Sequence, residues 1–172
     1  MKNSISLSFR VRRAIVAIAS VFAALVITSP GTRAANWNGI EPLKSRRPDV
    51  ERVLGKPLRD QPGANATLHF KIAGGTVTVA FVEARFVATK KLLPELEGTV
   101  KQIVIQHENS RETPESLTIA GNSNFERQDG RDSTVVYRNL KEGIVYTFIG
   151  GKLKTTYFTP SSEQWARAQK GT

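Results

Sequence analysis

Hydrophobic and polar residues alternate along two neighbouring segments near the middle of the chain. Residues 68–72 are apolar at every second position, and residues 77–81 repeat this period. Gly74 and Gly75 lie between the two segments. Alternation with a period of two is typical of strands with one buried face, and glycine pairs are typical of tight turns. The pattern predicts a β-hairpin over residues 68–81.

Two further regions show the same alternation. Residues 100–107 predict a third strand, with Ile103 and Ile105 on one face. Three more strands follow late in the chain, and the turns between them contain glycine, which predicts an antiparallel meander. These strands are expected at residues 134–138, 144–149 and 152–159.

One helix is predicted near the start of the folded region. Val50, Val53 and Leu54 recur at positions i, i+3 and i+4 and are expected to form one apolar stripe. Ser45 is a good N-cap, because its hydroxyl can accept hydrogen bonds from free backbone N–H groups. Gly55 can adopt the conformation that ends a helix. Since a helix this short is unstable alone, it is expected to pack on the sheet.

These elements predict a single α+β domain over residues 35–160. It has one short N-terminal helix packed on an antiparallel sheet of about six or seven strands. Residues 83–98 lack a regular period and are predicted to form a loop whose leucines pack over the sheet. Residues 161–172 are polar and are predicted to form a flexible tail, with at most a helical turn capped by Ser161.

Residues 1–34 have the layout of a secretory signal peptide. Lys2 and three arginines precede an apolar run over residues 14–27, and small residues precede Ala35. A run of about 14 apolar residues is shorter than the roughly 20 that a membrane-spanning helix needs. We therefore expect cleavage before Ala35, no transmembrane segment afterwards, and export to the periplasm or the medium; retention as an anchor is the alternative. The chain contains no cysteine, which excludes a lipoprotein anchor and disulfide bonds.

Basic residues outnumber acidic ones, and the leader accounts for half of the excess. The whole chain has a formal net charge of +10; the leader carries five basic residues and no acidic ones, so the remainder has a net charge of +5. This balance favours weak attraction to anionic surfaces. Six cations crowd into residues 44–59, against Asp49 and Glu51. The candidate partner contacts are Trp37, Arg46, Arg47, Arg52 and Lys56.

Two interpretations of this basic cluster stay open. The cluster can contact an envelope protein or an anionic surface polymer. It can also be a solvated helix face that its own acids partly neutralise. Nucleic acid is not an expected partner, since export removes the opportunity and no basic strand pattern with aromatic residues is present. The sequence does not indicate an oligomeric state.

The sequence predicts no catalytic, cofactor-binding or metal-binding residue. His69 and His107 are the only histidines, and no metal-ligand spacing connects them. Residues 121–124 lack the second glycine of a hydrolase nucleophile elbow, and a cysteine nucleophile is absent. A small exported hydrolase is the alternative, with carboxylates that converge in a cleft. Its acids would come from Glu83, Glu95, Glu97, Glu126, Asp129 and Asp132.

Two motifs bracket the predicted domain. The first is W-x-G-I-x-P-L-x-S-x-R-x-D-V-E-x-x-L-G-x-P over residues 37–57, and the second covers residues 137–160 and begins Y-R-N-L-K-E-G-I. Together they resemble a group of exported bacterial proteins without an assigned function, whose members often carry cysteines around the first hairpin. A looser similarity is to the outer-membrane assembly lipoproteins of the BamE/SmpA type. That similarity implies a capped helix followed by hairpins and a protein-binding role, although this chain lacks their lipid-bearing cysteine.

The function that these patterns favour is binding. The leader, the basic cluster and the resemblance together indicate an exported, non-catalytic binding or accessory module of the cell envelope. The small exported hydrolase stays the alternative. A structural module without a ligand of its own is a third interpretation.

The leader makes a direct prediction about the exported protein. When the whole chain is expressed in a bacterium that exports it, the protein recovered from the periplasm should begin at Ala35, because signal peptidase cuts after small residues. Intact-mass spectrometry of the purified protein measures this N-terminus. A mass that still includes residues 1–34 would mean that the leader is a retained anchor.

Overall fold

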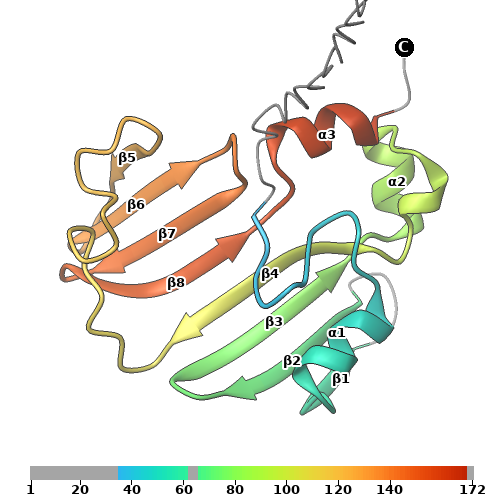
Figure 1. Ribbon diagram of the computed structural model, residues 1–172, viewed down its shortest axis with the longest axis horizontal. Helices are drawn as coiled ribbons and strands as arrows, with labels where there is room; N and C mark the ends of the chain where they lie inside the picture. Colours follow the sequence, from blue (N-terminus) through green and yellow to red (C-terminus); the bar gives the residue numbers. More distant parts are fainter. Residues whose placement is uncertain (1–34, 62–65, 170–172) are drawn as a thin grey trace, which may run out of the picture.

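The computed structural model describes residues 35–61 and 66–169, which build one antiparallel sheet with helices beside it (Figure 1). The strand order is β1-β2-β3-β4-β8-β7-β6-β5. The strands are β1 (Arg59–Gln61), β2 (Thr67–Ile72), β3 (Gly75–Phe81), β4 (Val100–His107), β5 (Glu126–Asp129), β6 (Thr134–Asn139), β7 (Ile144–Ile149) and β8 (Lys152–Phe158). The helices are α1 (Arg47–Leu54), α2 (Ala84–Lys90), the 3₁₀-helix η1 (Pro94–Leu96) and α3 (Ser162–Ala168).

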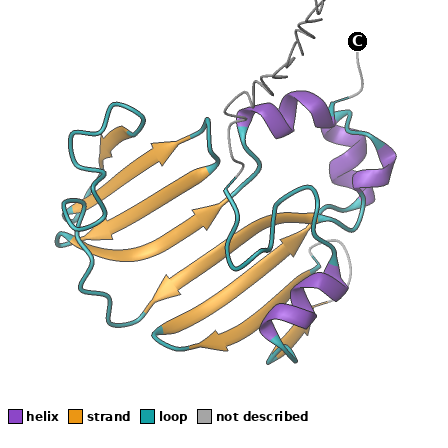
Figure 2. Cartoon of the chain, viewed as in Figure 1, coloured by secondary structure: helices purple, strands orange, loops and turns teal. Residues whose placement is uncertain are grey.

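The pairing of β4 with β8 joins two halves of the sheet (Figure 2). One half consists of β1 to β4 and the other of β5 to β8, and in each half strands that follow one another in the chain lie side by side. At the join, Ile103 lies opposite Phe158 and Gln106 lies opposite Thr155. The single sheet therefore depends on a contact between segments far apart in the sequence.

One face of the sheet is covered by α1 and by loop segments. Over the first half, Ile40 and Val50 are fully buried against the strands, and Trp37 and Leu54 pack at the margin of this core. Over the second half, residues 117–125 pack on the strands through Leu117, Ile119 and Phe125. The strand residues of the two cores are Leu68, Phe70, Val77, Val79, Phe81, Val100, Ile103, Ile105, Tyr137, Phe148 and Leu153.

The helices α2, η1 and α3 form a third packed cluster beside the sheet. Val82, Leu92 and Ala168 are buried there. The ring centroids of Phe86 and Trp165 are 6.1 Å apart, at an interplanar angle of 50°. Within the described residues, none of the helices is long and apolar enough to cross a membrane.

The predicted antiparallel α+β class is confirmed, and the predicted number of strands and helices is only roughly matched. The described sheet has eight strands instead of six or seven. The two extra strands are β1 and β5, whose residues are all exposed, so no alternation marks them in the sequence. The predicted loop over residues 83–98 contains α2 and η1, and neither of them buries a residue fully. Without a buried stripe, α2 has no helical period to detect.

Residues 162–168, which the sequence assigned to a polar tail, form α3. Its first turn has the expected cap: the Ser161 hydroxyl accepts from the Gln164 N–H at 3.1 Å, and the Gln164 side chain accepts from the Ser161 N–H at 2.9 Å. The amide nitrogen of Gln164 also donates to the main-chain oxygen of Pro42 at 2.9 Å. This segment therefore belongs to the fold, whereas residues 170–172 and the predicted leader lie outside the described residues.

The prediction that Ser45 caps α1 is wrong. The Ser45 hydroxyl accepts from the Glu41 N–H at 2.9 Å and so closes the preceding turn. The N-cap is Arg46, and its N–H donates to the carboxylate of Asp49 at 3.0 Å. The carboxylate of Asp49, rather than the hydroxyl of Ser45, therefore accepts a hydrogen bond from the backbone at the start of the helix.

The apolar stripe of α1 is narrower than predicted. Val50 is fully buried and Leu54 is partly buried, but the side chain of Val53 is 42% exposed. Gly55 ends the helix with a φ of 77°, as its position predicted. Because α1 lies over the β1 end of the sheet (Figure 1), only one side of it meets a core.

Gly75 begins β3 where the backbone of β4 is very close. A Cβ at this position would lie 1.9 Å from the main-chain oxygen of Gln106. We expect Gly75→Ala to lower the free energy of unfolding by about 2 kcal/mol or more, as overpacking does, and urea denaturation measures it. Gly130→Ala is the control, because its nearest neighbouring atoms would lie at 3.4 Å. Equal losses from the two variants would contradict the steric argument.

Candidate functional site

Helix α1 and the edge strand β1 lie together at one end of the sheet, and these two elements and the residues that flank them carry the basic cluster (Figure 1). Arg46 donates from Nη1 to the main-chain oxygen of Glu97 at 2.9 Å, and from Nη2 to that of Glu95 at 2.6 Å. These bonds tie the start of α1 to the residues of η1. Arg46 was predicted to contact a partner, and the structure directs its guanidinium at the backbone of its own chain.

Arg47 connects α1 to β1. Its guanidinium pairs with the carboxylate of Asp60 through both terminal nitrogens, and Nε donates to Glu51 at 2.9 Å. The bonds to Asp60 and then to Glu51 raise the pKa of Arg47 above its usual value. Two acids therefore neutralise Arg47 and fix its direction, as bidentate arginine–carboxylate pairs do.

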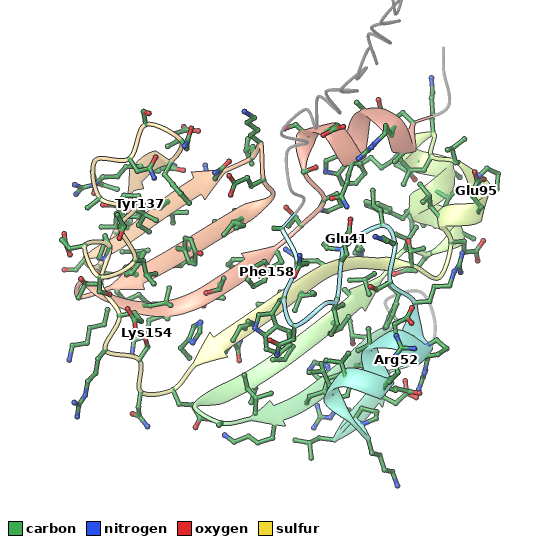
Figure 3. All side chains as sticks on the ribbon, in the orientation of Figure 1. Glu41, Arg52, Glu95, Tyr137, Lys154 and Phe158 are labelled. Atoms are coloured by element: carbon green, nitrogen blue, oxygen red, sulfur yellow. The ribbon has the colours of Figure 1, made fainter. Side chains whose placement is uncertain are left out.

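Arg52 lies on the outer side of α1 (Figure 3) and pairs with Asp49 one turn earlier, with an Nη2–Oδ1 distance of 2.8 Å. The hydrogen bond from the Arg46 N–H, assisted by Arg52, holds the pKa of Asp49 below its usual value. The side chain of Arg52 is 73% exposed. An exposed pair of this kind is weak and exchanges readily with other anions, so Arg52 stays accessible to a partner.

Lys56 and Arg59 follow the end of α1 and are exposed. Neither makes an ion pair with the residues that the structure describes. Both cations therefore face solvent without an acid partner. Arg59 lies opposite His69 and so on the sheet face away from α1. Lys44 and Arg52 are also exposed and pair only with acids of their own segment, so Arg52 and Lys56 are the accessible cations at the end of α1.

Trp37 packs at the margin of the first core and is partly buried. Its N–H and carbonyl exchange hydrogen bonds with Ile40, at 3.0 and 2.9 Å. The indole therefore packs against the first core, and only part of it is left for contact with a partner.

Two apolar side chains project at the end of α1. Leu58 is 72% exposed and Val53 is 42% exposed. Leu58 and Lys56 also line a hollow of about 640 Å³ between α1 and β1, together with Arg47 and Asp60. We call the exposed residues at the C-terminal end of the helix and in the segment directly after it the α1 tip; it consists of Arg52, Val53, Lys56 and Leu58.

A second hollow, of about 490 Å³, lies on the other side of Arg47. Glu83 and Glu97 line it, and so do Arg47 and Arg85. It is where the structure brings two of the candidate carboxylates together. Glu97 is exposed and Glu83 is half-buried. A general acid needs a desolvated carboxyl group that stays protonated near neutral pH, and this open, arginine-flanked hollow does not supply that environment.

The two histidines lie on opposite faces of the sheet, because His69 alternates with the buried residues of β2 whereas His107 shares the face of Ile105. Nδ1 of His69 lies 3.0 Å from the hydroxyl of Thr78. Burial lowers the pKa of His107 below its usual value. Within residues 35–61 and 66–169, no group of three or more histidines and acids is placed to hold a metal ion.

Leu58 belongs to the α1 tip but was not among the predicted contacts. It lies directly after Pro57, outside the predicted helix and strands. The signal in the sequence was therefore a leucine that no predicted element accounts for. Such a residue can be a surface contact or an isolated packing contact, and its exposure in the structure distinguishes the two.

Comparisons with known proteins add little to this geometry. A comparison with sequence families and with curated proteins finds no match. Among solved structures, the chain is similar to the crystal structure of a DUF4309 family protein (YjgB) from Bacillus subtilis subsp. subtilis str. 168. The TM-score is 0.47 and the sequence identity is 14%, over 72% of this chain and 83% of that one. A likeness at this level carries no functional argument.

The contacts of the arginines predict different effects on stability. Arg46→Ala removes two hydrogen bonds to backbone oxygens and should lower the free energy of unfolding by about 1–2 kcal/mol. Arg52→Ala removes only an exposed pair within one helix and should leave that free energy nearly unchanged. Urea denaturation of the two variants beside the parent protein measures the difference. A larger loss for Arg52→Ala than for Arg46→Ala would contradict these assignments.

Proposed function

We propose that the protein is an exported, non-catalytic binding module of the cell envelope that engages an anionic partner through the α1 tip. The observation that carries this proposal is the division among the cations. Arg46 and Arg47 form hydrogen bonds with other elements of the fold, whereas Arg52 and Lys56 form no tertiary ion pair among the described residues and lie at the end of the helix that also carries the exposed Leu58. The surface therefore keeps positive charge that the fold does not use.

The fold also explains why this charge is held in place. Arg46 ties the start of α1 to η1, and the pair between Arg47 and Asp60 ties its flank to β1. A helix of eight residues would be unstable alone, and these contacts hold it rigidly at the sheet. Arg46 and Arg47 thus act as positioning residues for the α1 tip, and Arg52 and Lys56 act as the contacts themselves.

Support for the envelope comes from the leader and from the resemblance to exported bacterial proteins, both of which stay predictions. In an envelope the available anionic partners are acidic proteins, surface polymers and lipid head groups. A surface with mixed apolar and cationic side chains suits any partner that offers anionic groups beside apolar ones. The open hollow with Glu83 and Glu97 does not favour the hydrolase alternative, since both acids reach solvent.

Cross-linking in envelope extracts of the host organism tests the proposal. The parent protein should capture a discrete partner at low salt and lose it at high salt, because exposed charges are screened within about 3 Å at 1 M salt. Arg52→Gln combined with Lys56→Gln should abolish the capture. The matched control is Lys152→Gln combined with Lys154→Gln, which removes the same charge from exposed positions of β8.

The control separates a local surface from general electrostatic attraction. Figure 3 places Lys154 on the other side of the molecule from Arg52. If both double variants lose the partner equally, net charge rather than the α1 tip is responsible, and the proposal fails. Capture that is unchanged in both variants would also contradict it.

A further inference from the structure

The exposed apolar side chains of the molecule are few, and half of them lie at the α1 tip. Among the described residues, four large hydrophobic side chains are exposed: Val53, Leu58, Leu140 and Ile149. Val53 and Leu58 lie five residues apart, around the end of one helix, and Leu58 has the highest exposure of the four, at 72%. Single exposed apolar side chains are common, so it is the presence of two of them beside cations that distinguishes the α1 tip.

The cations alternate with these apolar residues along the chain. The order Arg52, Val53, Lys56, Leu58 alternates cations and apolar residues within seven positions. Asp49 pairs with Arg52 in an exposed contact, whereas Lys56 has no acid partner among the described residues. Alternation of this kind suits a boundary where phosphate groups lie directly above an apolar phase.

The position of the α1 tip allows it to meet a flat surface. The C-terminal end of α1 lies with β1 at one end of the sheet, away from α3 (Figure 1). Residues 55–58 turn the chain from α1 into β1, and the N–H of Leu58 donates to the main-chain oxygen of His69 at 2.7 Å. The main chain at Leu58 is thus held by β2, and its exposed side chain can enter a lipid interface without any change in the sheet.

We propose that the α1 tip docks on the head-group layer of an anionic phospholipid membrane. Leu58 and Val53 enter the boundary between head groups and acyl chains, and Arg52 and Lys56 contact lipid phosphates. This inference rests on the proposed function and names its partner. A soluble acidic polymer would use the cations alone, whereas the exposure of Leu58 beside them favours a partner with an apolar layer.

Vesicle flotation tests the inference with defined lipids. The exported protein, as recovered from the periplasm, is mixed with vesicles of phosphatidylcholine alone or of equal parts phosphatidylcholine and phosphatidylglycerol. It should float with the anionic vesicles at low salt and not with the neutral ones. Each cation near an anionic surface contributes roughly fivefold in affinity, so Arg52→Gln with Lys56→Gln should weaken binding by at least about tenfold.

Leu58→Ser is the second variant, and Leu140→Ser is its matched control. The side chain of Leu140 is 60% exposed, but it lies in the turn between β6 and β7. Losing a leucine from the interface should weaken binding by about tenfold, while the control should bind as the parent does. All variants carry the same N-terminus and should unfold at the parent's temperature, so neither leader retention nor misfolding can produce a difference between them.

The outcomes separate this inference from the proposed function. Binding to anionic vesicles that is lost in the α1 tip variants and kept in both controls would support lipid docking. No flotation, equal flotation with neutral vesicles, or flotation that the α1 tip variants do not reduce would overturn it. If flotation fails while envelope cross-linking still depends on Arg52 and Lys56, the partner is an acidic protein or polymer, and only the lipid inference falls.

Discussion

The pairing between β4 and β8 is the constraint on which the rest of the fold depends. Strands within each half are neighbours in the chain, whereas the residues paired at this join are 49 to 55 positions apart. Closing so long a loop costs conformational entropy before the contact contributes any stability. The compensation comes from the first core, because Phe158 of β8 packs against its buried residues. The two halves therefore share apolar contacts across the join rather than standing as independent units.

Strand β4 also sets the position of α1. The N–H of Leu43 donates to the carbonyl of Val100 and the N–H of Val100 donates to the carbonyl of Ser45, both at 2.7 Å. The segment that leads into the helix is thus hydrogen-bonded to β4. The side-chain amide of Gln164 in α3 also donates to the main-chain oxygen of Pro42 in this segment. Since the start and one flank of α1 are fixed, its C-terminal end is the part left to solvent. The accessible surface of the helix follows from how it is anchored.

The sequence predicted the elements whose partners are close in the chain. The hairpin of β2 and β3 and the meander of β6 to β8 follow from alternation and turn glycines, because each strand pairs with the next one along. The strands β1 and β5 could not be predicted from a period, since they are exposed throughout. The pairing of β4 with β8 could not be predicted from the sequence either. Nothing local in Ile103 or Phe158 specifies which distant strand each will meet.

The sequence identified the region of the candidate site but not the role of each cation within it. Arg46, Arg47 and Arg52 are the same type of residue in the same short segment. Arg46 nevertheless donates to residues about 50 positions away, and Arg47 donates to a carboxylate on another element. Such pairs exist only once the tertiary structure brings the groups together. Residues 44–61 carry six cations and three acids, and folding distributes this charge unevenly. It engages the arginines at the start of α1 in tertiary hydrogen bonds and leaves the cations at its end accessible, near the exposed Leu58.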